Sequence, residues 1–325
     1  MSGTRSSEEF RRDLHASFGV PADDVAAVVT KATGRPMVSL RRIVRGQDCE
    51  VYRAATDSDD EVVIRIKRFG EEGSLADEAW AMDQARRAGA PVPEVLLVDR
   101  LTSAGADLPV MVLAVAEGQA LTDRAGLTAA ERHAALARAG EVLARINGIE
   151  VPGFWRPGPG GEWMRDWAAL MTGFIADREA ERDLVCAMGF GADEFDRMIA
   201  WLHTYADEFP CRRPVLCHGD FTSEHIFVDR RLHVSAIIDF GMYCGGPSIS
   251  DLAYLRYAMP QPDLAAILAG YGVTANDDDD FWRRLDLHAL GLAIGNLASE
   301  VTVGNTAAAR ESADSLATIL RGLSG

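Results

Sequence analysis

Two short apolar segments, each ending in an aspartate, constrain the fold of this chain more than any other feature of its sequence. Residues 215–217 lead into His218-Gly219-Asp220, and residues 234–238 lead into Asp239-Phe240-Gly241. Apolar runs of this length, separated by a turn, are typical of a β-hairpin. The sequence therefore predicts that Asp220 and Asp239 lie together at the end of a small hairpin.

Two carboxylates in that arrangement suit phosphoryl transfer. One can accept the proton of an attacking hydroxyl, and the other can hold the metal ion that is bound to nucleotide phosphates. We assign the catalytic role to Asp220 and the metal to Asp239, because Mg²⁺ prefers hard oxygen ligands. An aspartate in a turn can also do no more than cap local backbone groups. The spacing of the two motifs favours the chemical role.

The two motifs resemble the protein-kinase signature, which is His-Arg-Asp, an Asn five residues after that Asp, and then Asp-Phe-Gly. Gly219 stands in place of the arginine, and this is similar to the aminoglycoside phosphotransferase family, kinase-like enzymes that phosphorylate small molecules. The resemblance covers about residues 38–300. It implies an α+β, two-lobe, protein-kinase-like fold. The N-lobe would hold a five-stranded sheet with one inserted helix, and the C-lobe would be mainly helical.

The chain departs from the signature at the metal-binding Asn, which would fall at position 225 and is His225 here. A neutral imidazole can bind a divalent ion, although an oxygen ligand suits Mg²⁺ better. Similar enzymes, notably macrolide kinases, carry His at this position. The resemblance therefore implies that His225 joins Asp239 as a metal ligand. The alternative is a catalytically silent module that binds a nucleotide or another ligand.

The residues that would hold the nucleotide follow from the same resemblance. Arg65 ends a Val-Val-Ile-Arg run where kinases have Val-Ala-Ile-Lys, so it is the expected phosphate contact. Lys67 shares that strand face and is the alternative. Glu78, on the next predicted helix, matches the acidic residue that anchors the cation. Gly46 lies where a phosphate-covering loop belongs, although no second glycine follows it there.

Two further residues near the motifs are expected to be structural. His218 would pack beneath the catalytic loop, with Gly219 supplying a backbone conformation that other residues resist. Asp251 resembles the aspartate that braces this loop in the family. The predicted helix over 281–301 is mostly apolar but carries four polar residues, namely Asp286, His288, Asn296 and Glu300. In the family this region borders the acceptor pocket, but helix caps and surface positions are the favoured explanation.

Periodicity predicts how the lobes are divided. Residues 8–33 have helical spacing, with the second helix starting at Pro21. The predicted strands follow at 38–44, 50–55, 61–69, 95–98 and 109–115. A helix over 72–88 separates the third strand from the fourth. We expect a nucleotide-binding N-lobe over 1–116, including the helical extension, and a C-lobe over 117–325 with the catalytic hairpin and the acceptor pocket.

Charge and composition limit the partners. The 325 residues carry a formal net charge of −16, and no basic patch of the kind that binds nucleic acid stands out. The acidity suits a polycationic partner or serves only solubility. No apolar run can span a bilayer, and the amino terminus lacks a signal-peptide core, so we expect a cytoplasmic protein without a membrane partner. The five cysteines match neither a disulfide framework nor a zinc site.

The sequence thus predicts transfer of the γ-phosphate of ATP or GTP, with Mg²⁺, to a hydroxyl of a small molecule. The favoured acceptor is an aminoglycoside or another antibiotic, which would give resistance by O-phosphorylation. The alternative enzyme is a metabolite kinase with a choline-like or homoserine-like acceptor. A neutral or singly charged acceptor, such as a macrolide, would need a larger apolar pocket than a polycation.

Overall fold

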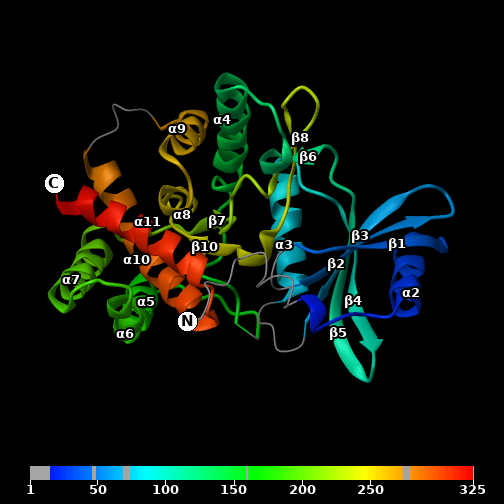
Figure 1. Ribbon diagram of the computed structural model, residues 1–325, viewed down its shortest axis with the longest axis horizontal. Coiled ribbons are helices and arrows are strands. Elements are labelled where there is room, and N and C mark those ends of the chain that lie inside the picture. Colours follow the sequence, from blue (N-terminus) through cyan, green and yellow to red (C-terminus); the bar gives the residue numbers. More distant parts are fainter. Residues whose placement is uncertain (1–14, 46–48, 69–73, 159, 274–278, 325) are drawn as a thin grey trace.

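The computed structural model describes residues 15–45, 49–68, 74–158, 160–273 and 279–324, which form two lobes (Figure 1). The first lobe is built on an antiparallel sheet with the strand order β1-β2-β3-β5-β4. Its strands are β1 (Met37–Ile43), β2 (Cys49–Thr56), β3 (Glu61–Lys67), β4 (Val95–Ser103) and β5 (Ala106–Ala114). Helix α3 (Leu75–Arg87) follows β3, so the predicted order of five strands with one inserted helix is confirmed.

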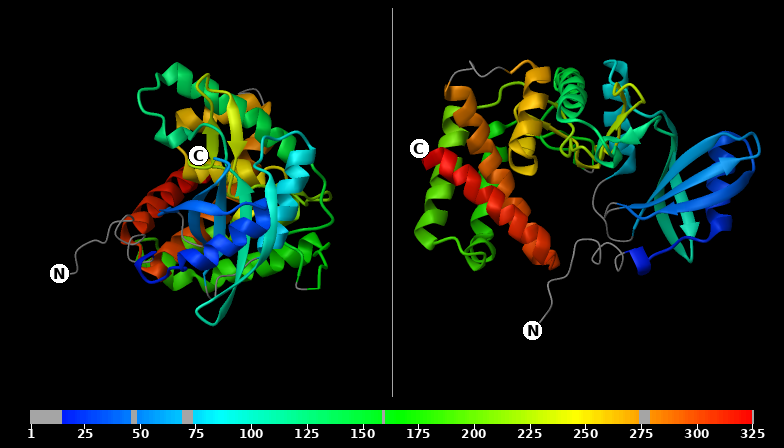
Figure 2. Two further views of the ribbon diagram at one scale, coloured as in Figure 1. Left: turned by 90° about the vertical axis from the view of Figure 1, so that its right-hand side faces the viewer. Right: turned by 45° about the horizontal axis from the view of Figure 1, so that its top comes forward.

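Helices cover both faces of this sheet. Helix α2 (Ala22–Thr33) packs its apolar side chains against one face, and α3 lies on the other face, toward the second lobe (Figures 1 and 2). Side chains of strand β3 point alternately to the two faces of the sheet. Ile64 and Ile66 belong to the core beneath α2, and the intervening Arg65 therefore points to the α3 face. The two-residue period of the strand thus places the Arg65 guanidinium where the two lobes meet.

The second lobe is mainly helical, as predicted. Its helices are α4 (Ala129–Ile146), α5 (Trp167–Ala180), α6 (Arg182–Ala187), α7 (Ala192–Glu208), α8 (Ser250–Ala258), α9 (Gln261–Tyr271), α10 (Asp279–Val303) and α11 (Thr306–Ser324). Its short elements are β6 (Gln119–Ala120), η1 (Leu121–Asp123), β7 (Val215–Cys217), β8 (Ile226–Val228), β9 (Val234–Ile237), η2 (Phe240–Met242) and β10 (Cys244–Gly246).

The predicted hairpin between the two aspartates is wrong in its pairing. β7, which precedes Asp220, pairs with β10, whereas β9, which precedes Asp239, pairs with β8. The reason is that the chain reverses after Asp220 and forms β8, whose side chains Ile226 and Val228 are buried and whose backbone takes the edge of β9. The two aspartates still meet, but they do so through side chains and loops.

The connection between the lobes is short. β5 ends at Ala114, and β6 begins at Gln119 and pairs with β8 of the second lobe. The boundary predicted between residues 116 and 117 falls in this connection, and the division into two domains stays a prediction.

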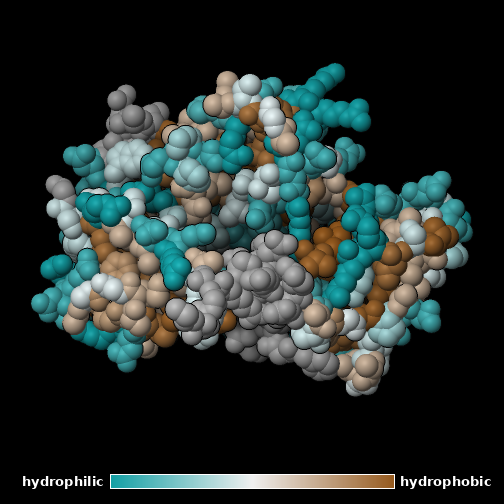
Figure 3. Space-filling model, in the orientation of Figure 1, coloured by the Kyte–Doolittle hydropathy of each residue, from teal (hydrophilic) through white to brown (hydrophobic). Residues whose placement is uncertain are grey.

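One apolar core joins α3 to the second lobe. The same buried cluster contains Met82 of α3, Leu136 of α4, Phe240 of η2 and Leu290 of α10. On the face shown in Figure 3, hydrophilic residues are spread over the helical lobe, and hydrophobic residues reach the surface over the sheet. None of the helices in the described ranges is both long and apolar enough to cross a membrane.

Candidate active site

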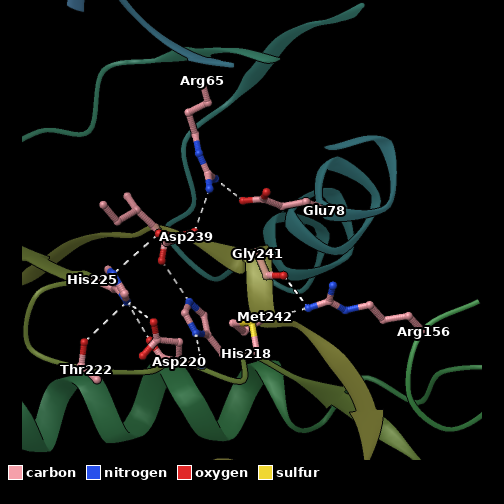
Figure 4. Close-up of polar contacts among 11 residues, drawn as sticks. Arg65, Glu78, Arg156, His218, Asp220, Thr222, His225, Asp239, Gly241 and Met242 are labelled. Atoms are coloured by element: carbon pink, nitrogen blue, oxygen red, sulfur yellow. Dashed lines mark hydrogen bonds and ion pairs between the residues drawn. The ribbon is translucent and has the colours of Figure 1, made fainter. Parts of the chain in front are cut away.

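His225 lies between Asp220 and Asp239 (Figure 4). Its Nδ1 is 2.8 Å from the backbone oxygen of Asp220, and its Nε2 is 3.7 Å from Oδ2 of Asp239. A carbonyl oxygen only accepts hydrogen bonds, so Nδ1 carries a hydrogen, and in the neutral form of the ring Nε2 then keeps its lone pair. That lone pair is on the side of the ring that faces Asp239. Two electron-pair donors facing each other favour a cation between them.

The donor atoms present at this point suit a divalent ion. Burial opposes ionisation of Asp239, but Arg65 and His225 outweigh it, and the pKa of the Asp239 carboxyl falls to about 2. The pair therefore combines an ionised carboxylate with an imidazole nitrogen. Within the described residues, no three His, Cys, Asp or Glu side chains cluster as a metal site. Mg²⁺ in nucleotide enzymes is bound by one or two carboxylates together with phosphates, which is what this donor set could supply.

The His218 side chain ties the two motifs together. Its Nε2 donates to the backbone oxygen of Ile238 over 3.0 Å, and its Nδ1 accepts from the backbone N–H of Asp220 over 3.2 Å. Burial, with a further contribution from His225, lowers the pKa of His218 to about 4, so the ring is neutral at pH 7. This is the structural role beneath the loop that the sequence predicts.

The carboxylate of Asp251 holds the backbone of the same loop. It accepts from the N–H of His218 over 2.8 Å and from the N–H of Gly219 over 2.7 Å. A third hydrogen bond, also over 2.8 Å, comes from Asn147, which directly follows α4. Gly219 has φ +83°, and a Cβ there would lie 2.0 Å from the backbone oxygen of Met242. Only glycine suits this position, which explains why the loop reads His-Gly-Asp.

Arg65 links the sheet to both of its acidic neighbours. It forms an ion pair with Glu78 on α3, and its Nη2 donates to Oδ1 of Asp239 over 2.9 Å (Figure 4). The side chains of Arg65 and Glu78 are 11% and 3% exposed, so this pair is buried. Lys67 is also buried and near enough to Glu78 to favour its ionised form. Gly46 lies outside the described residues.

Tyr254 is the residue at this site that the sequence reading missed. Its hydroxyl donates to Oδ1 of Asp220 over 2.6 Å. Burial raises the pKa of Tyr254 and the charge of Asp220 raises it further, so the hydroxyl stays protonated. The signal lay in the sequence Ser250-Asp-Leu-Ala-Tyr, because residues three apart on a helix share a face. Tyr254 therefore points to the same loop as Asp251.

A pocket of about 450 Å³ opens beside Asp220. Its aromatic lining consists of Trp155, Trp167, Phe174, Tyr205, Tyr254 and Tyr257. Two of the four polar residues on α10, His288 and Asn296, also line it. His288 Nδ1 is 2.6 Å from the Tyr205 hydroxyl, and the Asn296 amide donates to Ser312 over 2.8 Å. The favoured explanation as caps and surface positions is therefore wrong for these two, because α10 forms a wall of the pocket.

The sheet with its inserted helix, the helical lobe and the two aspartates at the lobe junction define a kinase-like phosphotransferase fold. A family model described as "Phosphotransferase enzyme family" matches residues 39–288. The chain belongs to this family. A comparison with curated proteins finds no match to the sequence.

Solved structures show the same fold at low identity. A thermostable mutant of aminoglycoside phosphotransferase APH(4)-Ia, in a ternary complex with AMP-PNP and hygromycin B, is 20% identical with a TM-score of 0.70, covering 93% of this chain and 99% of that one. Spectinomycin phosphotransferase APH(9)-Ia is 13% identical with a TM-score of 0.60, covering 94% and 98%. Macrolide 2'-phosphotransferase MphH from Brachybacterium faecium is 19% identical with a TM-score of 0.56, covering 91% and 98%.

The buried pair predicts a large effect of Glu78→Gln on stability. Removing one partner of a buried ion pair leaves an uncompensated charge, which costs about 3–5 kcal/mol of stability. The free energy of unfolding should fall by about 3 kcal/mol, the lower value of that range, because Asp239 still contacts Arg65. Urea denaturation measures it. Glu61→Gln is the matched control, because its ion pair with Arg53 is exposed and its loss should leave stability close to wild type. Equal effects of the two substitutions would contradict this account.

Proposed function

We propose that this chain transfers the γ-phosphate of ATP or GTP to a hydroxyl of a small molecule, and that the acceptor is an antibiotic. The observation that carries the proposal is the placement of Asp220 and Asp239 on either side of His225, with Arg65 of the other lobe in contact with Asp239. This geometry offers a base for the acceptor on one side and a metal and phosphate site on the other.

Asp220 is the proposed base, and its two oxygens differ. Oδ1 accepts the hydrogen of Tyr254. Oδ2 lies 3.5 Å from His225 Nδ1, whose shorter contact is with the backbone oxygen of Asp220, so Oδ2 is the oxygen proposed to receive the acceptor. As the acceptor oxygen bonds to the γ-phosphorus, its proton passes to Oδ2, and the bond from phosphorus to the β,γ-bridging oxygen breaks. The nucleoside diphosphate then leaves. Proton transfer of this kind contributes about 10²–10⁴-fold to a rate.

Asp239 and His225 are the proposed ligands of Mg²⁺, which when bound would neutralise charge on the phosphates. Arg65 is the proposed phosphate contact, with Lys67 as the alternative. Arg65 is already oriented by Glu78 and reaches Asp239, so its guanidinium stands next to the proposed metal site. A planar guanidinium can donate to a phosphate and keep a carboxylate partner at the same time.

Three of the solved relatives support an antibiotic acceptor. The solved structures named above are called aminoglycoside, spectinomycin and macrolide phosphotransferases, and the first holds AMP-PNP together with hygromycin B. The test is release of nucleoside diphosphate against a panel of hydroxylated antibiotics, with choline and homoserine in parallel. Acceptor-dependent release with an antibiotic supports the proposal. Release with the metabolites alone would indicate a metabolite kinase, and no release would indicate a silent binding module.

Asp220→Ala should abolish turnover and leave nucleotide affinity within a few-fold of wild type, because the carboxylate faces the acceptor. The loss of kcat should be at least about 10²-fold. Asp229→Ala is a suitable control, because Asp229 lies in the next turn and caps the backbone N–H groups of Arg231 and His233. Near-wild-type turnover in a folded Asp220→Ala protein would falsify the assignment.

Asp239→Asn should raise the Mg²⁺ concentration needed for half-maximal activity and weaken nucleotide binding as well, because an amide holds a divalent ion less strongly than a carboxylate. His225→Asn should keep activity, since Asn supplies an oxygen ligand at the same position. Titration of Mg²⁺ against initial rate measures both variants. An unchanged Mg²⁺ dependence in Asp239→Asn would show that this carboxylate is not a ligand.

Tyr254→Phe should lower kcat by about tenfold while KM for the nucleotide stays unchanged, because the hydroxyl orients the Asp220 carboxylate through a charge-assisted hydrogen bond. Tyr254 is thus a positioning residue. Tyr52→Phe removes another buried tyrosine hydroxyl, which accepts from the Val20 N–H in the first lobe, and should not change kcat. Steady-state kinetics of both variants distinguish loss of Asp220 orientation from a general loss of stability. Equal kcat values for Tyr254→Phe and Tyr52→Phe would count against a positioning role for Tyr254.

A further inference from the structure

The pocket beside Asp220 is poor in free negative charge. The described lining residues include two carboxylates, Asp220 and Asp251. Asp251 is 1% exposed, and its oxygens already accept three hydrogen bonds from His218, Gly219 and Asn147. Of these two carboxylates, only Asp220 can meet a bound ligand.

Another part of the lining is an arginine that is paired with a glutamate. Arg178 of α5 lines the pocket where α5 passes α10, and Gly295 leaves room for it, since a Cβ there would lie 2.1 Å from Arg178 Nη1. Arg178 donates to Glu181 over 2.9 Å. Burial, with a contribution from Arg284, lowers the pKa of His288 to about 4, so that residue adds no charge at pH 7.

Aromatic and aliphatic side chains form most of the remaining surface. Trp167 and Tyr205 stack edge to face at 5.9 Å, and Tyr254 and Tyr257 do so at 5.1 Å. Trp155 lines the pocket and is 58% exposed. Exposed aromatic faces beside a cavity favour apolar ligand surface and can hold a single cation over a ring.

These observations bear on the acceptor. A polycation entering this pocket would lose water from several ammonium groups, and each unpaired ion removed from water costs several kcal/mol. Among the lining residues described, the pocket provides one accessible carboxylate, and the Arg178 guanidinium in its wall is already paired with Glu181. An apolar body instead gains free energy from every part of its surface that the rings bury.

We propose that the acceptor has a largely apolar body and at most one positive charge, and that its hydroxyl points to Asp220. This inference rests on the proposed function, because it takes the pocket beside Asp220 as the acceptor site. The volume of about 450 Å³ is within the range of sites for drug-sized ligands. The net charge of −16 then belongs to the protein surface and does not mark a polycation site.

Isothermal titration calorimetry on the full chain without nucleotide tests the inference independently of turnover. The probes are erythromycin, a macrolide with one amine, and hygromycin B, an aminoglycoside with several. Erythromycin should bind at least about tenfold more tightly, and its Kd should change little between low and high salt, because apolar burial is not screened. Equal or tighter binding of hygromycin B, or no binding of erythromycin at millimolar concentration, would overturn the inference.

A variant adds a direct test of the missing charge. Ser299 lines the pocket on α10 and is exposed, so Ser299→Asp places a carboxylate at its edge with little effect on packing. Hygromycin B should then bind up to about fivefold more tightly, while erythromycin is unaffected. Ser39→Asp, on exposed β1 in the other lobe, adds the same charge and should change neither Kd. Equal effects of both variants on hygromycin B would show that the whole surface, and not the pocket, governs its binding.

Release of nucleoside diphosphate, measured on the same two compounds, keeps the two proposals apart. The expected order of affinities without release of diphosphate would support the pocket chemistry and count against the phosphotransferase assignment, which absence of release across the whole panel would refute. Phosphorylation of a tightly bound hygromycin B would support the phosphotransferase assignment and refute the proposed apolar acceptor.

Discussion

The hydrogen bonds of the His218 ring are the constraint on which the site depends. One nitrogen accepts from the N–H of Asp220, and the other donates to the oxygen of Ile238, directly before Asp239. A neutral ring with both nitrogens bonded satisfies two backbone groups that burial would otherwise leave unpaired. It also sets the separation of two segments that share no strand pairing.

Neighbouring side chains stabilise a strained backbone conformation at the second motif, Asp239-Phe240-Gly241. Asp239 adopts φ +64°, a left-handed conformation that a residue with a Cβ resists. The Arg156 guanidinium donates to the backbone oxygen of Tyr243, two residues beyond Gly241, and lies over the Tyr243 ring. Arg65 reaches the Asp239 carboxylate from the other lobe. Contacts from both lobes thus keep this carboxylate turned toward His225.

The order of strands and the inserted helix could be predicted from sequence because each depends on local periodicity and on turn residues. The two motifs could be predicted from their residue types and spacing. The pairing of β7 with β10 could not, since short strands carry no signal for their partners and tertiary packing chooses among them. Tyr254 was missed because its role arises from the approach of α8 to the loop, and a tyrosine on a helix is in most cases a core residue.

The acceptor pocket was the least predictable part, because at least six separate segments contribute its walls, from Trp155 to Ser299. Net charge is a property of the whole surface and gave no guide to a lining that is rich in aromatic and aliphatic side chains. The central claim is that a phosphoryl group moves onto the acceptor under the control of Asp220. Mass spectrometry of the antibiotic after incubation with the enzyme, Mg²⁺ and nucleoside triphosphate tests it most directly. The account predicts one added phosphate on a hydroxyl; free inorganic phosphate with an unmodified acceptor would contradict it.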